Sequence, residues 1–281
     1  MDVVVPRDGF ELAGDLLLPS VEPLCGVVMI GGSGAADRVN GGYFEPIRTH
    51  LVGRGVAVLS YDKRGVGDSG GTWVHATLED FADDALAATA ALHAVLPPSV
   101  PTIVYGHSEG GWVALIAAAR EPSRVDRIIT TSCPGVTPGA QDRHAVAVEV
   151  ADSRDGDEVL AAYDQVMAAS HYASALGTLK AVPRLRNLLG ELSEQEWAFL
   201  TRKQDYDPIR DADNITCPWL AVYGAADRLV PVAQSVAAFA NRATTVTIPG
   251  ADHRLQIEGR LAASFLDTVT EWLLSEGKQF R

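Results

Sequence analysis

The feature that most constrains the fold is an alternation of short apolar runs with stretches of helical pattern along most of the 281-residue chain. The run at 27–30 is apolar throughout and ends in glycines, and a similar run covers 56–61. Such runs are typical of parallel strands that are buried on both faces. A helix is predicted for 43–52. A second helix is predicted to open with a capping box at Thr77 and to end before two prolines.

The remaining predicted elements repeat this alternation. The chain begins with a predicted hairpin, whose strands cover 2–5 and 10–18. Further strands are predicted at 102–105, 125–131, 219–223 and 244–248, and further helices after Ser108, at 232–240 and at 260–274. The alternation predicts an α/β fold, with a mostly parallel central sheet and helices on both of its faces.

The rhythm changes between 136 and 213, where no buried strand is evident. Helices are predicted there at 157–170, 178–189 and 194–203. This segment follows the sixth predicted strand, so it leaves the sheet at the carboxyl edge, where ligands bind in parallel sheets. We therefore expect a helical lid at 136–213, inserted into a core made of 1–135 and 214–281. A simple extension of the hydrophobic core is the alternative.

Residues 106–110 read Gly-His-Ser-Glu-Gly, directly between a predicted strand and a predicted helix. In a sharp turn from strand to helix, the positions two residues before and after the serine must be small, or the backbones would collide. Such a turn presents the serine hydroxyl at the sheet edge. The motif can arise by chance, but its flanking elements favour Ser108 as a nucleophile.

Composition excludes several classes of partner. The formal net charge is −13, which disfavours a nucleic acid or an anionic membrane as partner. The three cysteines are far apart, and no pair has the spacing of metal ligands, which fits reduced thiols in the cytoplasm. No stretch reaches the roughly 20 apolar residues that span a bilayer. We expect a soluble cytoplasmic protein, with the mature form of a secreted one as the alternative.

A base and an acid for Ser108 follow later strands. Asp227 comes after the predicted strand 219–223, and His253 comes after 244–248. An imidazole can take the proton of a serine hydroxyl, and a carboxylate on its other nitrogen fixes the tautomer. Asp252 competes for the acid role. Asp227 is favoured because a residue adjacent to the histidine points away from it.

An oxyanion hole requires two backbone N–H donors near the nucleophile. Glu109, the residue after the serine, is predicted to supply one of them. The second is expected from the glycine-rich loop after 27–30, with Ser33 preferred and Gly32 or Gly34 remaining open. A phosphate-binding role for these glycines is disfavoured, because a third glycine at the required spacing is absent.

Side chains of the expected lid are candidates for lining a substrate pocket, although aromatic residues on helices more often belong to a core. The candidates are Tyr163, Met167, His171, Tyr172, Trp197 and Tyr206. His144 and His171 are expected to line the pocket or to lie on the surface, and His107 is expected to point away from Ser108. Asp37 and Arg38 are expected either to form an ion pair that braces the oxyanion loop or to be solvated separately.

Taken together, these motifs resemble the α/β-hydrolase superfamily over nearly the full chain. More narrowly, the chain is similar to bacterial carboxylesterases related to the serine aminopeptidase and dienelactone hydrolase groups. The segments that carry the resemblance are 32–38 (GSGAADR), 61–69 (YDKRGVGDS) and 106–111 (GHSEGG). The resemblance implies Ser108, Asp227 and His253 as a catalytic triad, and ester hydrolysis with no cofactor or metal. Many lipases carry His-Gly before the oxyanion residue, whereas this chain has two glycines.

The sequence therefore predicts a serine hydrolase that cleaves esters of small or medium acyl groups through an acyl-enzyme. A thioesterase and a small-peptide hydrolase are alternatives with the same triad, and a catalytically silent binding protein is a third. The expected partner is a small-molecule ester or thioester. The sequence leaves the oligomeric state open, a homodimer included. Dehalogenase and epoxide hydrolase chemistry is disfavoured, because these enzymes normally carry an aspartate at the position of Ser108.

Overall fold

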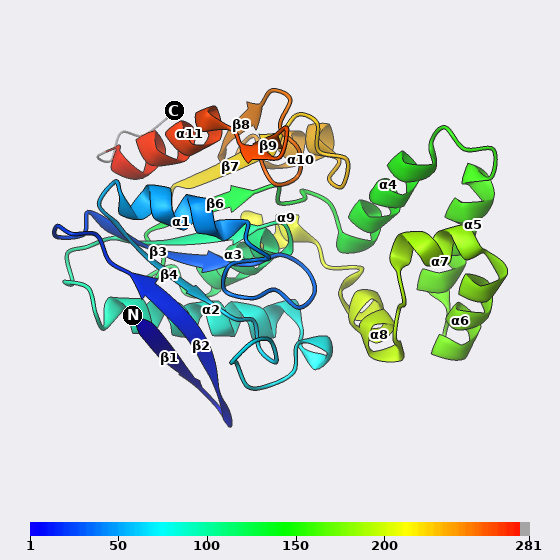
Figure 1. Ribbon diagram of the computed structural model, residues 1–281, viewed down its shortest axis with the longest axis horizontal. Coiled ribbons are helices and arrows are strands. Elements are labelled where there is room, and N and C mark those ends of the chain that lie inside the picture. The colour runs from blue at the N-terminus through cyan, green and yellow to red at the C-terminus, as the bar shows by residue number, and fades with distance from the viewer. Residues whose placement is uncertain (276–281) are drawn as a thin grey trace.

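The computed structural model describes residues 1–275, and its centre is a single eight-stranded sheet. The strands lie in the order β1-β2-β4-β3-β5-β6-β7-β8 (Figure 1). Their bounds are β1 Asp2–Arg7, β2 Phe10–Leu17, β3 Cys25–Ile30, β4 Val56–Tyr61, β5 Thr102–His107, β6 Arg127–Thr131, β7 Trp219–Gly224 and β8 Thr244–Ile248. The hairpin β1–β2 joins the sheet antiparallel to β4, and β3 to β8 are parallel. The predicted α/β-hydrolase architecture is confirmed.

Helices cover both faces of this sheet. Helices α1 (Phe44–Val52) and α11 (Ala263–Leu274) bury apolar side chains in one core cluster. Helices α2 (Leu78–His93), α3 (Glu109–Arg120) and α10 (Val232–Phe239) contribute to the cluster on the other face. Strands β3, β4, β5 and β7 are buried at every position, which explains their nearly unbroken apolar sequences.

A group of helices interrupts the sheet between β6 and β7. The helices are α4 (Pro138–Val150), α5 (Gly156–Ala168), α6 (Tyr172–Ala181), α7 (Pro183–Leu189), α8 (Glu194–Lys203) and α9 (Pro208–Ala212). Helices α4–α8, here called the helical insertion, stand together beyond the carboxyl edge of the sheet, and α9 packs back on α3 (Figure 1). The insertion has an apolar cluster of its own, which includes Val150, Val159 and Leu179.

Two local expectations were wrong, and one helix was missed. The helix predicted at 178–189 is two helices, because Pro183 has no amide hydrogen and starts α7 instead of continuing α6. Helix α4 was missed, although Thr137 caps it and Pro138 stands at its first position. The last helix begins at Ala263, because a short hairpin of β9 (Gln256–Ile257) and β10 (Arg260–Leu261) precedes it.

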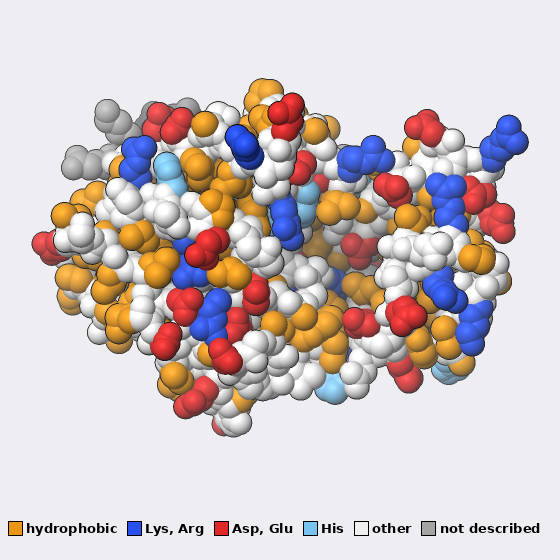
Figure 2. All heavy atoms as spheres, in the orientation of Figure 1, with side chains coloured by type: hydrophobic (Ala, Val, Ile, Leu, Met, Phe, Trp, Pro, Cys, Tyr) orange, Lys and Arg blue, Asp and Glu red, His pale blue; other side chains and the backbone are white. Residues whose placement is uncertain are grey.

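The surface is hollowed where the helical insertion faces the sheet edge. Figure 2 shows this hollow between the two parts of the molecule, with hydrophobic side chains in its walls. No helix within residues 1–275 combines the length and apolarity that crossing a bilayer requires. In the same part of the chain, no group of three or more His, Cys, Asp or Glu side chains is arranged to hold a metal ion.

Candidate active site

Ser108 stands in a strained turn between β5 and α3. Its backbone angles are φ 55° and ψ −120°, in a region that residues with a side chain rarely adopt. Hydrogen bonds on both sides hold the turn: the Ser108 amide donates to Thr131 O at 2.9 Å, and the Gly111 amide donates to Ser108 O at 2.8 Å. The side chain is half-buried at the carboxyl edge of the sheet.

Two glycines make this turn sterically feasible. A Cβ atom on Gly106 would lie 2.0 Å from Gly110 O. A Cβ atom on Gly110 would lie 2.4 Å from Ile30 O in the neighbouring strand. Both positions therefore require glycine, as a turn that presents a serine at a sheet edge predicts.

Asp227 and His253 meet beside this turn. His253 Nδ1 lies 2.8 Å from Asp227 Oδ2, and the Asp227 side chain is fully buried while that of His253 is 18 % exposed. The amides of Leu229 and Val230 donate to Asp227 Oδ1, so a turn fixes the carboxylate. The hydrogen bonds of residues 1–275 do not include one between Ser108 and His253, a contact that is often long in hydrolases without substrate.

Asp252, the alternative candidate for the acid, binds backbone amides of its own loop. Its Oδ1 accepts hydrogen bonds from the amides of Arg254 and Gln256, each at 2.9 Å. This carboxylate therefore closes the loop that carries His253, and the contact with the imidazole belongs to Asp227.

His107 lies in the core rather than in the open site. It is 3 % exposed, its Nδ1 is 3.1 Å from Thr131 Oγ1, and its ring packs against Tyr43 and His253 with centroid separations of 4.5 and 5.0 Å. Burial lowers the pKa of His107 well below its ordinary value, and the nearby His253 lowers it further. His107 therefore supports the His253 ring as a neutral group.

The loop between β3 and α1 faces Ser108. A Cβ atom on Gly32 would lie 3.6 Å from Ser108 Cβ. The Gly32 amide is directed at Asn40 Oδ1, at 3.4 Å, which leaves Ser33 and Gly34 as the candidates for the loop donor. Across the turn, the Glu109 amide belongs to the first turn of α3, where backbone donors have no partner within the helix.

The Glu109 side chain was missed by the sequence analysis, which considered only its amide. The carboxylate is buried between two ammonium groups, with Lys63 Nζ 2.9 Å from Oε1 and Lys203 Nζ 2.5 Å from Oε2. Burial alone would raise the pKa of Glu109, but Lys203 and Lys63 outweigh it and lower the pKa to about 2. The sequence did contain a signal for these ion pairs. Glu109 is a charged residue at the start of an otherwise apolar helix, and a buried charge requires a partner.

Arg38 does not pair with Asp37. Its guanidinium contacts Asp15 at 3.0 Å, Asp62 at 2.5 Å and Asp68 at 2.9 Å, and Asp37 accepts from the Gly41 amide instead. Both expectations for this dipeptide were wrong, because its two charges are fixed by different partners. Arg38 thus links the loop between β3 and α1, here called the oxyanion loop, to the segment that follows β4.

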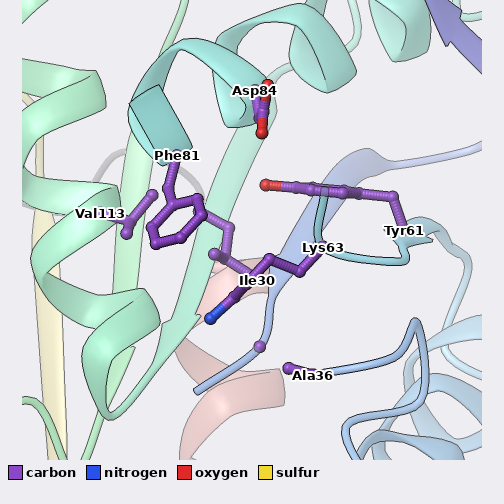
Figure 3. A pocket seen from close by; sticks show the side chains of 8 residues that line it. Ile30, Ala36, Tyr61, Lys63, Phe81, Asp84 and Val113 are labelled. Carbon is purple, nitrogen blue, oxygen red and sulfur yellow. The ribbon is translucent and has the colours of Figure 1, made fainter. Parts of the chain in front are cut away.

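Two cavities lie near the oxyanion loop, and they differ greatly in size. The first, of about 10 Å³, lies beneath the loop and has room for about one water molecule (Figure 3). In Figure 3 the Lys63 ammonium points away from Asp84 and Tyr61, which line the other end of this cavity. This cavity is too small for an organic substrate.

The second cavity, of about 160 Å³, joins the oxyanion loop to the helical insertion. Ser33 and Gly34 form one end, and the apolar walls are Trp73, Leu189, Leu192, Phe199 and Leu200. The carboxylates of Glu191 and Glu196 are also part of its lining. A larger cavity of about 370 Å³ lies entirely between α6, α7 and the start of α8, away from Ser108.

The aromatic candidates of the expected lid belong mainly to packing within the insertion. Tyr163 and Met167 are buried in its apolar cluster, and Trp197 Nε1 donates to Val166 O at 2.9 Å. Tyr172 lines the larger cavity, and Tyr206 bonds to Asp211 rather than facing the 160 Å³ cavity. His171 is exposed, and His144 is half-buried.

Known proteins are similar to this chain in sequence. The family described as "Serine aminopeptidase, S33" matches residues 33–260. A monoacylglycerol lipase from Mycolicibacterium smegmatis is 28% identical over 297 residues, which cover 95% of this chain and 94% of that protein. The parallel sheet, together with the strained Ser108 turn between β5 and α3 (here called the elbow), defines an α/β-hydrolase. Within this class, the chain belongs to the serine aminopeptidase S33 family.

Two solved structures with the same fold have low sequence identity to this chain. The proline iminopeptidase of Mycobacterium smegmatis aligns with a TM-score of 0.67 at 17% identity and covers 97% of both chains. An esterase from Pyrococcus furiosus aligns with a TM-score of 0.69 at 18% identity, over 97% of this chain and 90% of that one. The chain is thus an α/β-hydrolase, and its fold is shared by an esterase and a peptidase of known structure.

Proposed function

We propose that this protein is a serine esterase that hydrolyses esters of small or medium acyl groups, with Ser108, Asp227 and His253 as its triad. The observation that carries the proposal is the 2.8 Å contact of Asp227 with His253, beside a serine held at φ 55°. The carboxylate fixes the proton on Nδ1, so Nε2 is free to act as the base.

The reaction runs in two balanced steps. Ser108 Oγ attacks the ester carbonyl while His253 Nε2 takes its proton, and the tetrahedral oxyanion collapses by releasing the alcohol, which receives that proton. Water then gives its proton to His253 and attacks the acyl-enzyme, and Ser108 leaves with the proton. Asp227 remains ionised and stabilises the imidazolium that forms in each step.

The amides of Ser33 and Glu109 are the proposed oxyanion donors. Donors fixed before the reaction stabilise the charge that develops on the carbonyl oxygen, and one such donor contributes about 10²–10³ in kcat. The preference for Ser33 over Gly32 is supported by the bond of the Gly32 amide to Asn40.

The helical insertion is proposed as a lid, within a domain organisation of 1–135, 136–213 and 214–281. The apolar 160 Å³ cavity between Ser33 and α8 is the proposed acyl site. This volume falls below the roughly 300–1,000 Å³ of pockets for drug-sized ligands, which favours short acyl groups. Glu191 and Glu196 at its lining, together with the net charge of −13, disfavour a polyanionic thioester carrier.

The proposal is tested with Ser108→Ala on a panel of p-nitrophenyl esters graded by acyl length, with matched thioesters and aminoacyl anilides. We expect at least a 10⁴-fold loss of kcat on the esters, because the nucleophile is removed. Retention of near wild-type ester turnover by Ser108→Ala would remove Ser108 from the mechanism. Faster turnover of the thioesters or anilides by the wild type would change the substrate class and keep the triad.

A further inference from the structure

Three ionisable side chains from different parts of the chain are buried together behind Ser108. Lys63 follows β4, Glu109 opens α3, and Lys203 ends α8 of the helical insertion. They are 7 %, 2 % and 8 % exposed, respectively. The two ammonium groups contact different oxygens of the one carboxylate, so Glu109 bridges the core to the insertion.

Each lysine also binds the oxyanion loop. Lys63 Nζ donates to Gly32 O at 2.6 Å, and Lys203 Nζ donates to Ser33 Oγ at 3.2 Å. Glu109 and Ser33 carry the two proposed oxyanion donors on their backbones. A single ammonium group, that of Lys203, therefore contacts the side chains of both donor residues.

Aromatic rings support both ammonium groups from the side. Lys63 Nζ lies 4.8 Å from the centroid of Phe81, and Lys203 Nζ lies 4.7 Å from that of Phe199. These cation–π contacts and the carboxylate fix the direction of each lysine. Burying these charges costs desolvation free energy, and the attraction within the ion pairs often does no more than offset that cost. We therefore expect the cluster to contribute little net stability and to fix the positions of its side chains.

A fourth charge completes the surroundings. Asp142 of α4 is close enough to Lys203 and Glu109 for both to affect its titration. Burial raises the pKa of Asp142 to about 6, and Lys203 partly offsets this rise. The nearby Glu109 adds to this rise, so Asp142 is a second acidic group in the neighbourhood of Lys203.

We propose that Lys203 is a positioning residue through which the helical insertion holds both halves of the oxyanion hole. The inference rests on the proposed esterase function. When α8 is docked, Lys203 orients Glu109 and Ser33 relative to each other, so the hole is complete only with the insertion in place. Lys203 acts on the rate through these residues, without contacting the ester.

Lys203 could instead only shape the acyl site. Esters of different acyl length distinguish this role from positioning of the oxyanion hole. An acetyl group is too small to fill the 160 Å³ cavity, whereas its carbonyl oxygen still requires the oxyanion hole. Loss of positioning lowers kcat for acetyl and hexanoyl esters alike, whereas a shaping role affects the hexanoyl ester alone. Removing Lys203 leaves Lys63 paired with Glu109, so no isolated carboxylate is left behind the elbow.

The test compares Lys203→Met, Lys203→Arg and the exposed control Lys180→Met, with rates expressed per active site titrated to completion by a fluorophosphonate. For Lys203→Met we expect a 10- to 100-fold loss of kcat on p-nitrophenyl acetate and hexanoate, with KM changed less than threefold. The affinity for an alkyl boronic acid, which forms a tetrahedral adduct with the serine, should fall by a similar factor. Lys203→Arg keeps the cation and should retain more activity, and Lys180→Met should match the wild type.

A kcat on acetate within threefold of the wild type in Lys203→Met would overturn the positioning role, as would a loss confined to hexanoate. If Lys203→Met does not fold, Lys203→Gln gives the same readout with a polar side chain. Ser108→Ala separates this outcome from failure of the proposed function. An inactive Ser108→Ala together with a normal Lys203→Met rejects the positioning role alone, whereas an active Ser108→Ala rejects the esterase mechanism itself.

Discussion

The sheet edge and the helical insertion position their side chains by different means. At the sheet edge, Ser108, Asp227 and His253 stand in the loops that follow β5, β7 and β8, and short turns fix each of them. The insertion has an apolar cluster of its own and joins the core at α8, where Phe199 packs against Trp73 and Phe81 and Lys203 pairs with Glu109. Under the proposed function, the reaction chemistry depends on local backbone geometry, and the substrate range depends on how a separately packed unit is docked.

The largest effect beyond Ser108 itself is expected at the sheet edge. Asp227→Asn should lower kcat by about 10⁴, because the amide favours the wrong imidazole tautomer. Asp252→Asn is the matched control, since the carboxylate of Asp252 accepts hydrogen bonds from the amides of Arg254 and Gln256 and leaves the imidazole to Asp227. Its kcat should stay within tenfold of the wild type, as measured on p-nitrophenyl acetate. The reverse order of the two losses would assign the acid to Asp252.

The junction between the two regions should show an intermediate effect, in the pH dependence of stability. The pKa of Glu109 is lowered from 4.5 to about 2, so its ionised form stabilises the fold above pH 4.5 and this stabilisation is lost as the pH falls toward 2. From pH 6 to pH 3, the unfolding free energy of the wild type should therefore fall by on the order of 2 kcal/mol more than that of Glu109→Gln, which has no carboxyl group at this position to protonate. Urea titrations at the two pH values measure this difference.

The control for this measurement is Asp164→Asn, at the exposed ion pair with Arg143. Exposed pairs contribute little to stability, so this variant should keep the wild-type difference between pH 6 and pH 3. Equal acid sensitivity of Glu109→Gln and the wild type would mean that the buried bridge does not couple the two regions energetically.

The smallest effect is expected within the insertion. Leu192→Trp narrows the 160 Å³ cavity and should lower kcat/KM on a hexanoyl ester about tenfold, with the acetyl ester within twofold. Leu188→Trp makes the same change at an exposed position of α7 and should leave both esters unaffected. Equal losses on the two esters in Leu192→Trp would place the acyl group elsewhere.

Much of the fold was predictable because its signals are local. The bounds of β4 and β8 agree with the predicted runs, and the elbow glycines followed from the steric demand of a tight turn. The break at Pro183 was also a local signal that was not used. Helix α4 offered a weaker signal, because only Pro138, Val146 and Val150 of its residues are buried and no regular apolar stripe results.

The sequence alone determined the class of fold, because strands, turns and helices depend mainly on neighbouring residues. It also gave the order of the candidate triad, because parallel strands all end at the same edge of the sheet. The tertiary structure decided which groups meet across long separations. It brought the His253 imidazole into contact with Asp227 rather than with Asp252, and it placed Lys203 against Glu109, 94 positions away in the chain. Such a contact has no local periodicity, since it is set by how the insertion packs against the core.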